Sequence, residues 1–112
     1  MKEIALEQKR KSKGEMMAAY FIVDITEITD PQMYAEYRKG VEPTLQQYGG
    51  KFLVRGGAYE TVEGDWQSQR LVILEFADVE QFKRWYNSPE YSELLKMRLK
   101  AATTRAVVVQ GV

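Results

Sequence analysis

Three charged residues, Asp24, Arg55 and Glu75, interrupt segments made mostly of β-branched, aliphatic and aromatic side chains. A charge inside a buried strand needs a partner, because an unpaired buried charge costs several kcal/mol. One interpretation is a small polar pocket in which Arg55 anchors a carboxylate or enolate-like oxygen while Asp24 or Glu75, as the catalytic residue, moves a proton. The alternative is that the three residues form structural ion pairs.

A second group of candidates surrounds an expected aromatic cleft. Arg98 follows Leu94 by four residues and Leu95 by three, so it lies at the edge of an apolar helical stripe. From there it either points into a cleft or extends to a surface carboxylate. An aromatic cleft with a few polar tips suits a small organic ligand. The ligand-binding candidates are Tyr37, Arg55, Gly56, Gly57, Trp85, Tyr86, Ser88, Tyr91 and Arg98.

Composition excludes several kinds of chemistry. The chain has no cysteine and no histidine, which removes thiolate chemistry and the most common general base and ligand of zinc or haem. We therefore expect no metal site and no cofactor. Lys and Arg together number 16, as do Asp and Glu, so no excess positive charge attracts nucleic acid.

The first half of the chain predicts a strand, a helix and a second strand. Residues 18–26 are rich in aromatic and β-branched side chains, which favour a strand. Asp30 and Pro31 are typical of a helix start, and Pro43 predicts that this helix bends or restarts near residues 40–42. The second strand is expected over residues 51–64, with Gly56 and Gly57 at a bulge or a close approach.

The second half predicts a strand over residues 70–76, a helix and a last strand over residues 106–112. Asp78 with Gln81 three residues later is a capping-box pattern at the start of this helix. Ser88 and Pro89 then predict that the helix restarts.

The resulting order, βαββαβ, predicts an α+β ferredoxin-like domain with a four-stranded antiparallel sheet and its helices on one face. Both faces of the central strands are apolar: Tyr20 and Ile22 alternate with Phe21 and Val23. An antiparallel sheet with one face in water is expected to alternate apolar with polar residues. We therefore expect a homodimer in which two sheets pack face to face as a dimeric α/β barrel.

The ends and length of the chain complete the organisation. The 112 residues suit one domain, over residues 16–112, with residues 1–15 as a charged flexible extension, a tag or a misassigned start. The apolar segments are far shorter than the roughly 20 residues of a membrane span, and no signal-peptide pattern occurs. We expect a cytoplasmic protein that binds neither membrane nor nucleic acid.

The segments YGGKFLVRGG and WYNSPEY, with Arg98 after them, resemble the family named domain of unknown function 1330, and the likeness extends from residue 17 to residue 112. The resemblance implies a dimeric α/β-barrel fold, in a superfamily that also holds cofactor-independent monooxygenases and muconolactone isomerase-like enzymes. It implies no particular reaction. The family's recurring positions correspond to Asp24, Tyr37, Arg55, Gly56, Gly57, Glu75, Trp85, Tyr86, Ser88, Pro89, Tyr91 and Arg98.

Three hypotheses of function follow. The first is a small-molecule-binding protein, with Arg55 as the anchor for an anionic or carbonyl-bearing metabolite and with proton transfer or isomerisation as the reaction if there is one. The second is a cofactor-independent monooxygenase of aromatic substrates, for which the histidine that several enzymes of the superfamily use is absent. The third is a structural or interaction module without a cavity.

Overall fold

A computed structural model describes residues 17–112, so the predicted extension over residues 1–15 lies outside the described part. Strand β1, Ala19–Ile28, pairs antiparallel with β3, Arg70–Phe76, and with β4, Ala102–Gln110. Strand β2, Lys51–Arg55, pairs antiparallel with β3 and completes the order β2-β3-β1-β4. This is the antiparallel sheet expected from the sequence.

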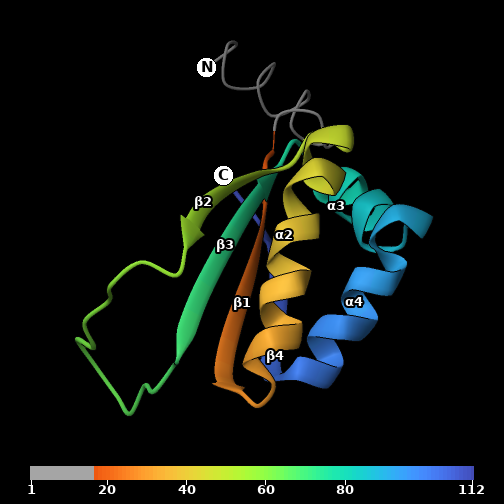
Figure 1. The fold of residues 1–112 in the computed structure, drawn as a ribbon. Coiled ribbons are helices and arrows are strands. Elements are labelled where there is room, and N and C mark those ends of the chain that lie inside the picture. The colour runs from red at the N-terminus through yellow and green to blue at the C-terminus, as the bar shows by residue number, and fades with distance from the viewer. Residues whose placement is uncertain (1–16) are drawn as a thin grey trace, which may run out of the picture.

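Three helices cover one face of this sheet (Figure 1). Helix α2, Pro31–Gln47, connects β1 to β2, while α3, Val79–Tyr86, and α4, Pro89–Ala101, connect β3 to β4. The first helix begins where Asp30 accepts a hydrogen bond from the Met33 amide, as its residue type predicted. The whole arrangement is an α+β ferredoxin-like fold.

Helix α2 continues through Pro43, so the predicted restart near residues 40–42 does not occur. Pro43 itself is exposed, whereas Val41, Thr44 and Leu45 on either side of it are buried. Packing of these neighbours holds the backbone helical although Pro43 cannot donate an amide hydrogen bond. Gly40 supports the packing because a Cβ there would lie 2.8 Å from the Leu94 side chain of α4.

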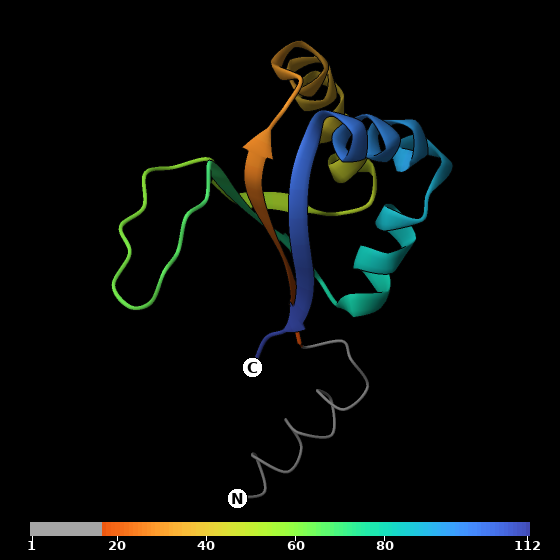
Figure 2. The same ribbon diagram turned by 90° about the horizontal axis from the view of Figure 1, so that it is seen from below.

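Strand β2 is shorter than predicted, because it ends at Arg55 and residues 56–69 form a long loop. Gly56 has a φ of 75°, a conformation that favours glycine and turns the chain away from β3. The Tyr59 hydroxyl then closes the loop by accepting a hydrogen bond from the Ser68 amide and donating one to the Ser68 carbonyl. Figure 2 shows this loop projecting to the side of the sheet away from the helices.

The second helical region divides at Ser88 as predicted. The Asp78 side chain accepts from the Gln81 amide and caps α3, but the Gln81 side chain does not complete a capping box. It donates instead to the Tyr48 carbonyl at the end of α2. The Ser88 side chain caps α4 by accepting from the Tyr91 amide, and its hydroxyl donates to the Trp85 carbonyl.

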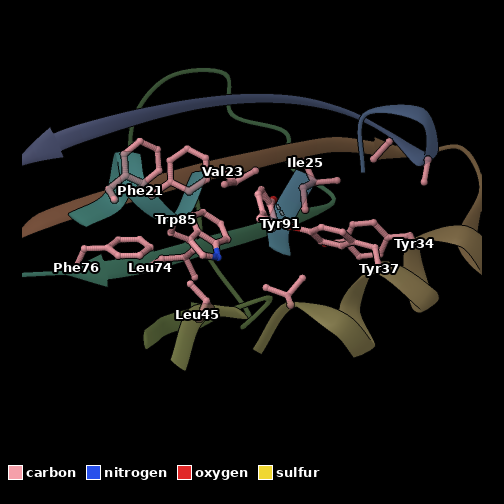
Figure 3. Close-up of a cluster of buried hydrophobic side chains, with 14 residues drawn as sticks. Phe21, Val23, Ile25, Tyr34, Tyr37, Leu45, Leu74, Phe76, Trp85 and Tyr91 are labelled. Atoms are coloured by element: carbon pink, nitrogen blue, oxygen red, sulfur yellow. Dashed lines mark hydrogen bonds between the residues drawn. The ribbon is translucent and has the colours of Figure 1, made fainter. Parts of the chain in front are cut away.

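The core fills the space between the helices and the sheet (Figure 3). Phe21, Val23 and Ile25 point into it from β1, and Trp85 and Tyr91 lie at its centre with ring centroids 4.0 Å apart. The side chains between them on β1, Tyr20, Ile22 and Asp24, therefore point to the opposite face. That open face has no helix over it, and its β4 residues Val107 and Val109 are 59% and 47% exposed.

Candidate functional site

A narrow pocket opens between α2 and the helix-covered face of the sheet. Its floor comes from β1 and β3, and its roof comes from one face of α2. Four arginines line it, and among the described residues no acidic side chain does. The complete lining is Phe21, Val23, Ile25, Tyr34, Tyr37, Arg38, Val41, Phe52, Arg55, Arg70, Val72, Leu74, Trp85 and Arg98.

Arg98 is the buried arginine of this pocket, with an exposed fraction of 3%. It extends from α4 to β4, where its Nη1 donates to the Thr104 hydroxyl over 2.9 Å. No carboxylate lies within ion-pair distance of it in residues 17–112, and its Nε has no hydrogen-bond partner there. A guanidinium stays protonated in proteins, so Arg98 places a positive charge in the pocket that no carboxylate of residues 17–112 compensates.

Two buried tyrosines lie beside Arg98. Their hydroxyl oxygens are 2.8 Å apart, one from Tyr37 on α2 and the other from Tyr91 on α4. Burial raises the pKa of both phenols, so they remain neutral and cannot neutralise the guanidinium. Burial also works to lower the pKa of Arg98, but the neighbouring Tyr91 and Tyr37 more than offset it and the pKa lies above its ordinary value.

The mouth of the pocket carries Arg38 from α2, Arg55 from β2 and Arg70 from β3. Arg55 is exposed, lies 4.1 Å above the Phe52 ring and forms a 3.4 Å ion pair with Glu42. The anchor expected from the sequence was Arg55, but the arginine in the buried position is Arg98. A contact with Arg55 is worth less because water screens this exposed guanidinium.

Gly56 allows Arg70 to approach the end of β2. A Cβ at Gly56 would lie 2.2 Å from Nη1 of Arg70, whose Nη2 is 3.5 Å from the Arg55 carbonyl oxygen. This is the close approach that the glycine pair predicted, although the bulge lies earlier, between Phe52 and Val54. A Cβ at Gly57, by contrast, would meet no described atom within 4 Å.

Of the remaining aromatic-region candidates, Trp85 lines the pocket, and the others are not part of its lining. Trp85 lines it and donates its indole N–H to the Thr44 hydroxyl over 2.9 Å. Tyr86 packs against Phe21, with ring centroids 5.7 Å apart, and Ser88 is occupied as the cap of α4. Tyr86, Ser88 and Tyr91 thus support the lining residues rather than face the pocket.

Asp24 and Glu75 do not meet Arg55, because they lie on the opposite, open face of the sheet. Asp24 Oδ2 accepts from Arg105 Nε at 2.8 Å, and a Glu75 oxygen lies 3.2 Å from the Lys51 ammonium nitrogen. Both pairs fit the structural alternative considered from the sequence. A joint site in which Arg55 holds a ligand and one of these carboxylates moves its proton does not exist within one subunit.

Two charged residues that line this pocket, Arg38 and Arg70, were not among the candidates, and neither was Thr104, which accepts a hydrogen bond from Arg98. Arg38 lies on an amphipathic helix and Arg70 at a strand start, where a charge is ordinary. The glycine pair predicted that another group approaches the end of β2 closely. The sequence did not show that this group is the Arg70 side chain. Thr104 depends on the register between β4 and β1, in which it lies opposite Ile25.

Two other kinds of site are absent from the described residues. No group of three or more acidic side chains in residues 17–112 is placed to hold a metal ion. Nor does any helix in that range combine the length and the apolar character needed to cross a bilayer.

The fold is similar to several solved structures. A protein of unknown function from Rhodopseudomonas palustris, RPA0582, is 18% identical with a TM-score of 0.72, covering 96% of this chain and 92% of its own. SnoaB, a cofactor-independent oxygenase from Streptomyces nogalater, is 12% identical with a TM-score of 0.58, at 82% and 90% coverage. A dimeric protein of unknown function with a ferredoxin-like fold from Bacteroides fragilis is 13% identical with a TM-score of 0.57, at 83% and 95% coverage.

At these identities the likeness concerns the fold alone. A comparison with curated proteins found no match. The sequence itself is more informative about relationship, because the model of one protein family matches residues 18–112, nearly the whole described chain. The protein therefore belongs to the family described as Domain of unknown function (DUF1330).

Proposed function

We propose that this protein binds a small organic anion with an apolar or aromatic body in the pocket between α2 and the sheet. The observation that carries the proposal is Arg98, a guanidinium that is 3% exposed and lines the pocket without a carboxylate partner in the described chain. Burying an unpaired charge costs several kcal/mol, so a site with this arrangement is expected to serve an anion. The apolar floor and the aromatic roof suit the rest of the ligand.

The proposal assigns roles to the lining residues. Arg98 anchors the anion, Tyr37 offers a neutral hydroxyl beside it, and Trp85 closes the pocket behind the floor residues. Arg38, Arg55 and Arg70 create a positive potential at the mouth that draws an anion inward. Tyr91 and Ser88 hold Tyr37 and Trp85 in place, and Gly56 holds space for Arg70.

The test is calorimetric titration with matched pairs of probes, hexanoate against hexanol and benzoate against benzyl alcohol. The carboxylates are expected to bind about tenfold or more tightly than the alcohols, since a charge-assisted hydrogen bond is worth about 1.5–3 kcal/mol. In Arg98→Met this advantage disappears. Arg84→Gln on the outer surface of α3 removes the same charge elsewhere and is expected to leave binding unchanged. Equal affinities for acid and alcohol in the unmodified protein would overturn the proposal.

Arg98→Met also separates binding from folding. Methionine fills a similar apolar volume, and replacing an uncompensated buried charge by a packed apolar side chain is often neutral or stabilising. The variant is therefore expected to unfold at the same temperature as the unmodified protein or at a higher one. Loss of binding together with a retained melting temperature assigns the effect to the guanidinium.

A second candidate function is cofactor-independent oxygenation of an aromatic substrate. The aromatic lining from Phe21, Tyr34, Phe52 and Trp85 supports it. Against it, the described lining supplies no carboxylate base, and the raised pKa of Tyr37 makes that phenol a donor rather than a proton acceptor. Oxygen consumption measured with a panel of quinols distinguishes the two functions, because binding alone consumes none.

We also propose that two subunits pair through the open face of the sheet. Apolar residues from neighbouring strands share this face, with Ile22 opposite both Ile73 and Val107 in the register. The solved relative from Bacteroides fragilis is itself dimeric. Pairing would cover the exposed valines of β4 and leave the pocket, which is on the other face, accessible.

A further inference from the structure

Two buried nitrogen donors in this pocket lack acceptors. Within residues 17–112, three buried side-chain nitrogen or oxygen atoms have no hydrogen-bond partner: Asp24 Oδ1, Arg70 Nε and Arg98 Nε. The aspartate oxygen belongs to the open face, whereas both arginines line the same pocket on the helix-covered face. Leaving a buried donor of a charged group without an acceptor destabilises the folded protein, so two such donors in one pocket require an explanation.

The two donors lie toward different ends of the pocket. Arg70 lies opposite Ile25 on one side of β1, and Thr104, which holds the Arg98 guanidinium, lies opposite Ile25 on the other side. Neighbouring strands are about 4.8 Å apart, so the backbone of Arg70 and that of Thr104, which the Arg98 guanidinium contacts, are separated by roughly 10 Å. The Arg70 guanidinium extends further away, toward Gly56 at the end of β2, so one small acidic group does not span both arginines.

The surface between the two arginines is apolar. Ile25, Val23 and Val72 form the floor, and the Tyr34 ring lies above, 5.9 Å from the Arg70 guanidinium carbon. Neither a carboxylate nor an amide side chain lines this stretch in the described chain. A molecule that satisfies both donors must therefore carry an acceptor at each end and an apolar part between them.

We propose that the natural ligand is a dianion, a small molecule with two carboxylate-like groups joined by a short apolar spacer. One acidic group would accept from the Nε edge of Arg98 at the closed side, and the other from the Nε edge of Arg70 at the mouth. A planar carboxylate can accept two parallel hydrogen bonds from one edge of a guanidinium, which makes this pairing specific. This inference rests on the anion-binding function proposed above and adds the second acidic group.

Gly56 helps to position Arg70, the residue proposed to bind the second acidic group. The Nη atoms of Arg70 are directed toward the end of β2, since Nη1 occupies the space of a Gly56 side chain and Nη2 faces the Arg55 carbonyl oxygen. This placement leaves Nε on the buried side of the guanidinium. Arg55, with its Glu42 partner, is less available to a ligand than Arg70.

The test compares adipate with hexanoate, which have the same number of carbon atoms but two and one carboxylates, by calorimetric titration. Adipate is expected to bind about tenfold or more tightly, the gain of one charge-assisted contact. Arg70→Gln is expected to remove this advantage, weakening adipate about tenfold or more while weakening hexanoate by a smaller factor. Arg98→Met is expected to weaken the binding of both probes. Arg84→Gln, which lies outside the pocket, is expected to change the binding of neither.

A series of dicarboxylates from succinate to pimelate tests the two-ended geometry. Two fixed donors predict an affinity that peaks at one chain length, whereas attraction to overall positive charge predicts no such peak.

If adipate and hexanoate bind equally, or if Arg84→Gln weakens adipate as much as Arg70→Gln does, the dianion proposal fails and anion binding stands. Equal affinities for adipate and hexanoate would mean that water, rather than a ligand, accepts the hydrogen bond of Arg70 Nε. If no carboxylate binds better than its alcohol, both proposals fail.

Discussion

At the scale of the residue, the main feature is a cation placed where water cannot screen it. Arg98 is enclosed by α4, the two phenols and Thr104, and none of these groups carries a negative charge at neutral pH. Such a position reduces the stability of the empty protein. A ligand that supplies the missing charge is expected to raise the melting temperature, since any molecule that binds only the folded state stabilises it.

The Tyr37 and Tyr91 pair predicts how stability depends on alkaline pH. Burial raises the pKa of both phenols in the folded protein above the ordinary value of 10.0. Above that pH the unfolded chain loses these protons while the folded one retains them, so the free energy of unfolding falls as pH rises. Each phenol contributes a slope of about 1.4 kcal/mol per pH unit in this range.

Tyr37→Phe checks this pair by urea unfolding at pH 8 and at pH values above 10. The substitution leaves the Tyr91 hydroxyl without its partner and is expected to cost about 1 kcal/mol at pH 8. Above pH 10 the variant is expected to lose stability less steeply, because one fewer buried phenol is involved. An identical slope in the variant and the unmodified protein would contradict burial as the cause.

At the scale of the element, the end of β2 decides how the mouth of the pocket is built. Gly56 ends the strand with a positive φ and leaves room for Arg70, whereas the space beside Gly57 is open. The two adjacent glycines therefore differ in role although their residue type is the same. This difference allows a matched pair of substitutions.

Gly56→Ala is expected to lower the free energy of unfolding by about 1–2 kcal/mol, because an alanine is strained at this φ. It is also expected to displace the Arg70 guanidinium and to weaken adipate binding more than hexanoate binding. Gly57→Ala is the control and is expected to change neither stability nor binding appreciably. Chemical denaturation and calorimetric titration measure the two effects, and equal results for both alanines would contradict the role given to Gly56.

At the scale of the whole molecule, the two faces of the sheet serve different purposes. The helix-covered face holds the core and the arginine pocket, and the open face holds an apolar surface bordered by two ion pairs. A monomer leaves this surface in water, which is unusual for a soluble domain. The dimer proposed above removes that exposure.

Ile73→Lys tests the dimer, because it places a charge at the centre of the open face, where Ile22 lies opposite. The unmodified protein is expected to sediment as a dimer at micromolar concentration, and the variant as a folded monomer. Leu99→Lys is the control, since Leu99 is an exposed apolar residue on α4, with an exposed fraction of 58%. A monomeric unmodified protein, or a variant that remains dimeric, would refute pairing through this face.

Local patterns in the sequence were enough to determine the elements and their order. Asp30, Asp78 and Ser88 mark helix starts because their side chains satisfy free amides within three residues, and strand alternation separates Tyr20 and Ile22 from Phe21 and Val23. Such short-range chemistry requires no knowledge of distant contacts. The errors at Pro43 and after Arg55 arose where packing or a positive φ overrode local preference. The last strand was also misplaced, because β4 begins at Ala102, four residues before the predicted start, and ends at Gln110.

Tertiary structure alone decided which candidates meet. Strand register places Asp24 and Glu75 on one face and Arg55 on the other, and alternation within each strand cannot relate the faces of different strands. The tertiary structure also brings Arg70, from β3, to the same pocket as Arg98, from α4, although the two residues are far apart in the sequence. Whether a buried charge has a partner depends on long-range contacts. For that reason the sequence could identify Arg98 as a candidate ligand-binding residue, but it could not show that no carboxylate of the described chain pairs with it.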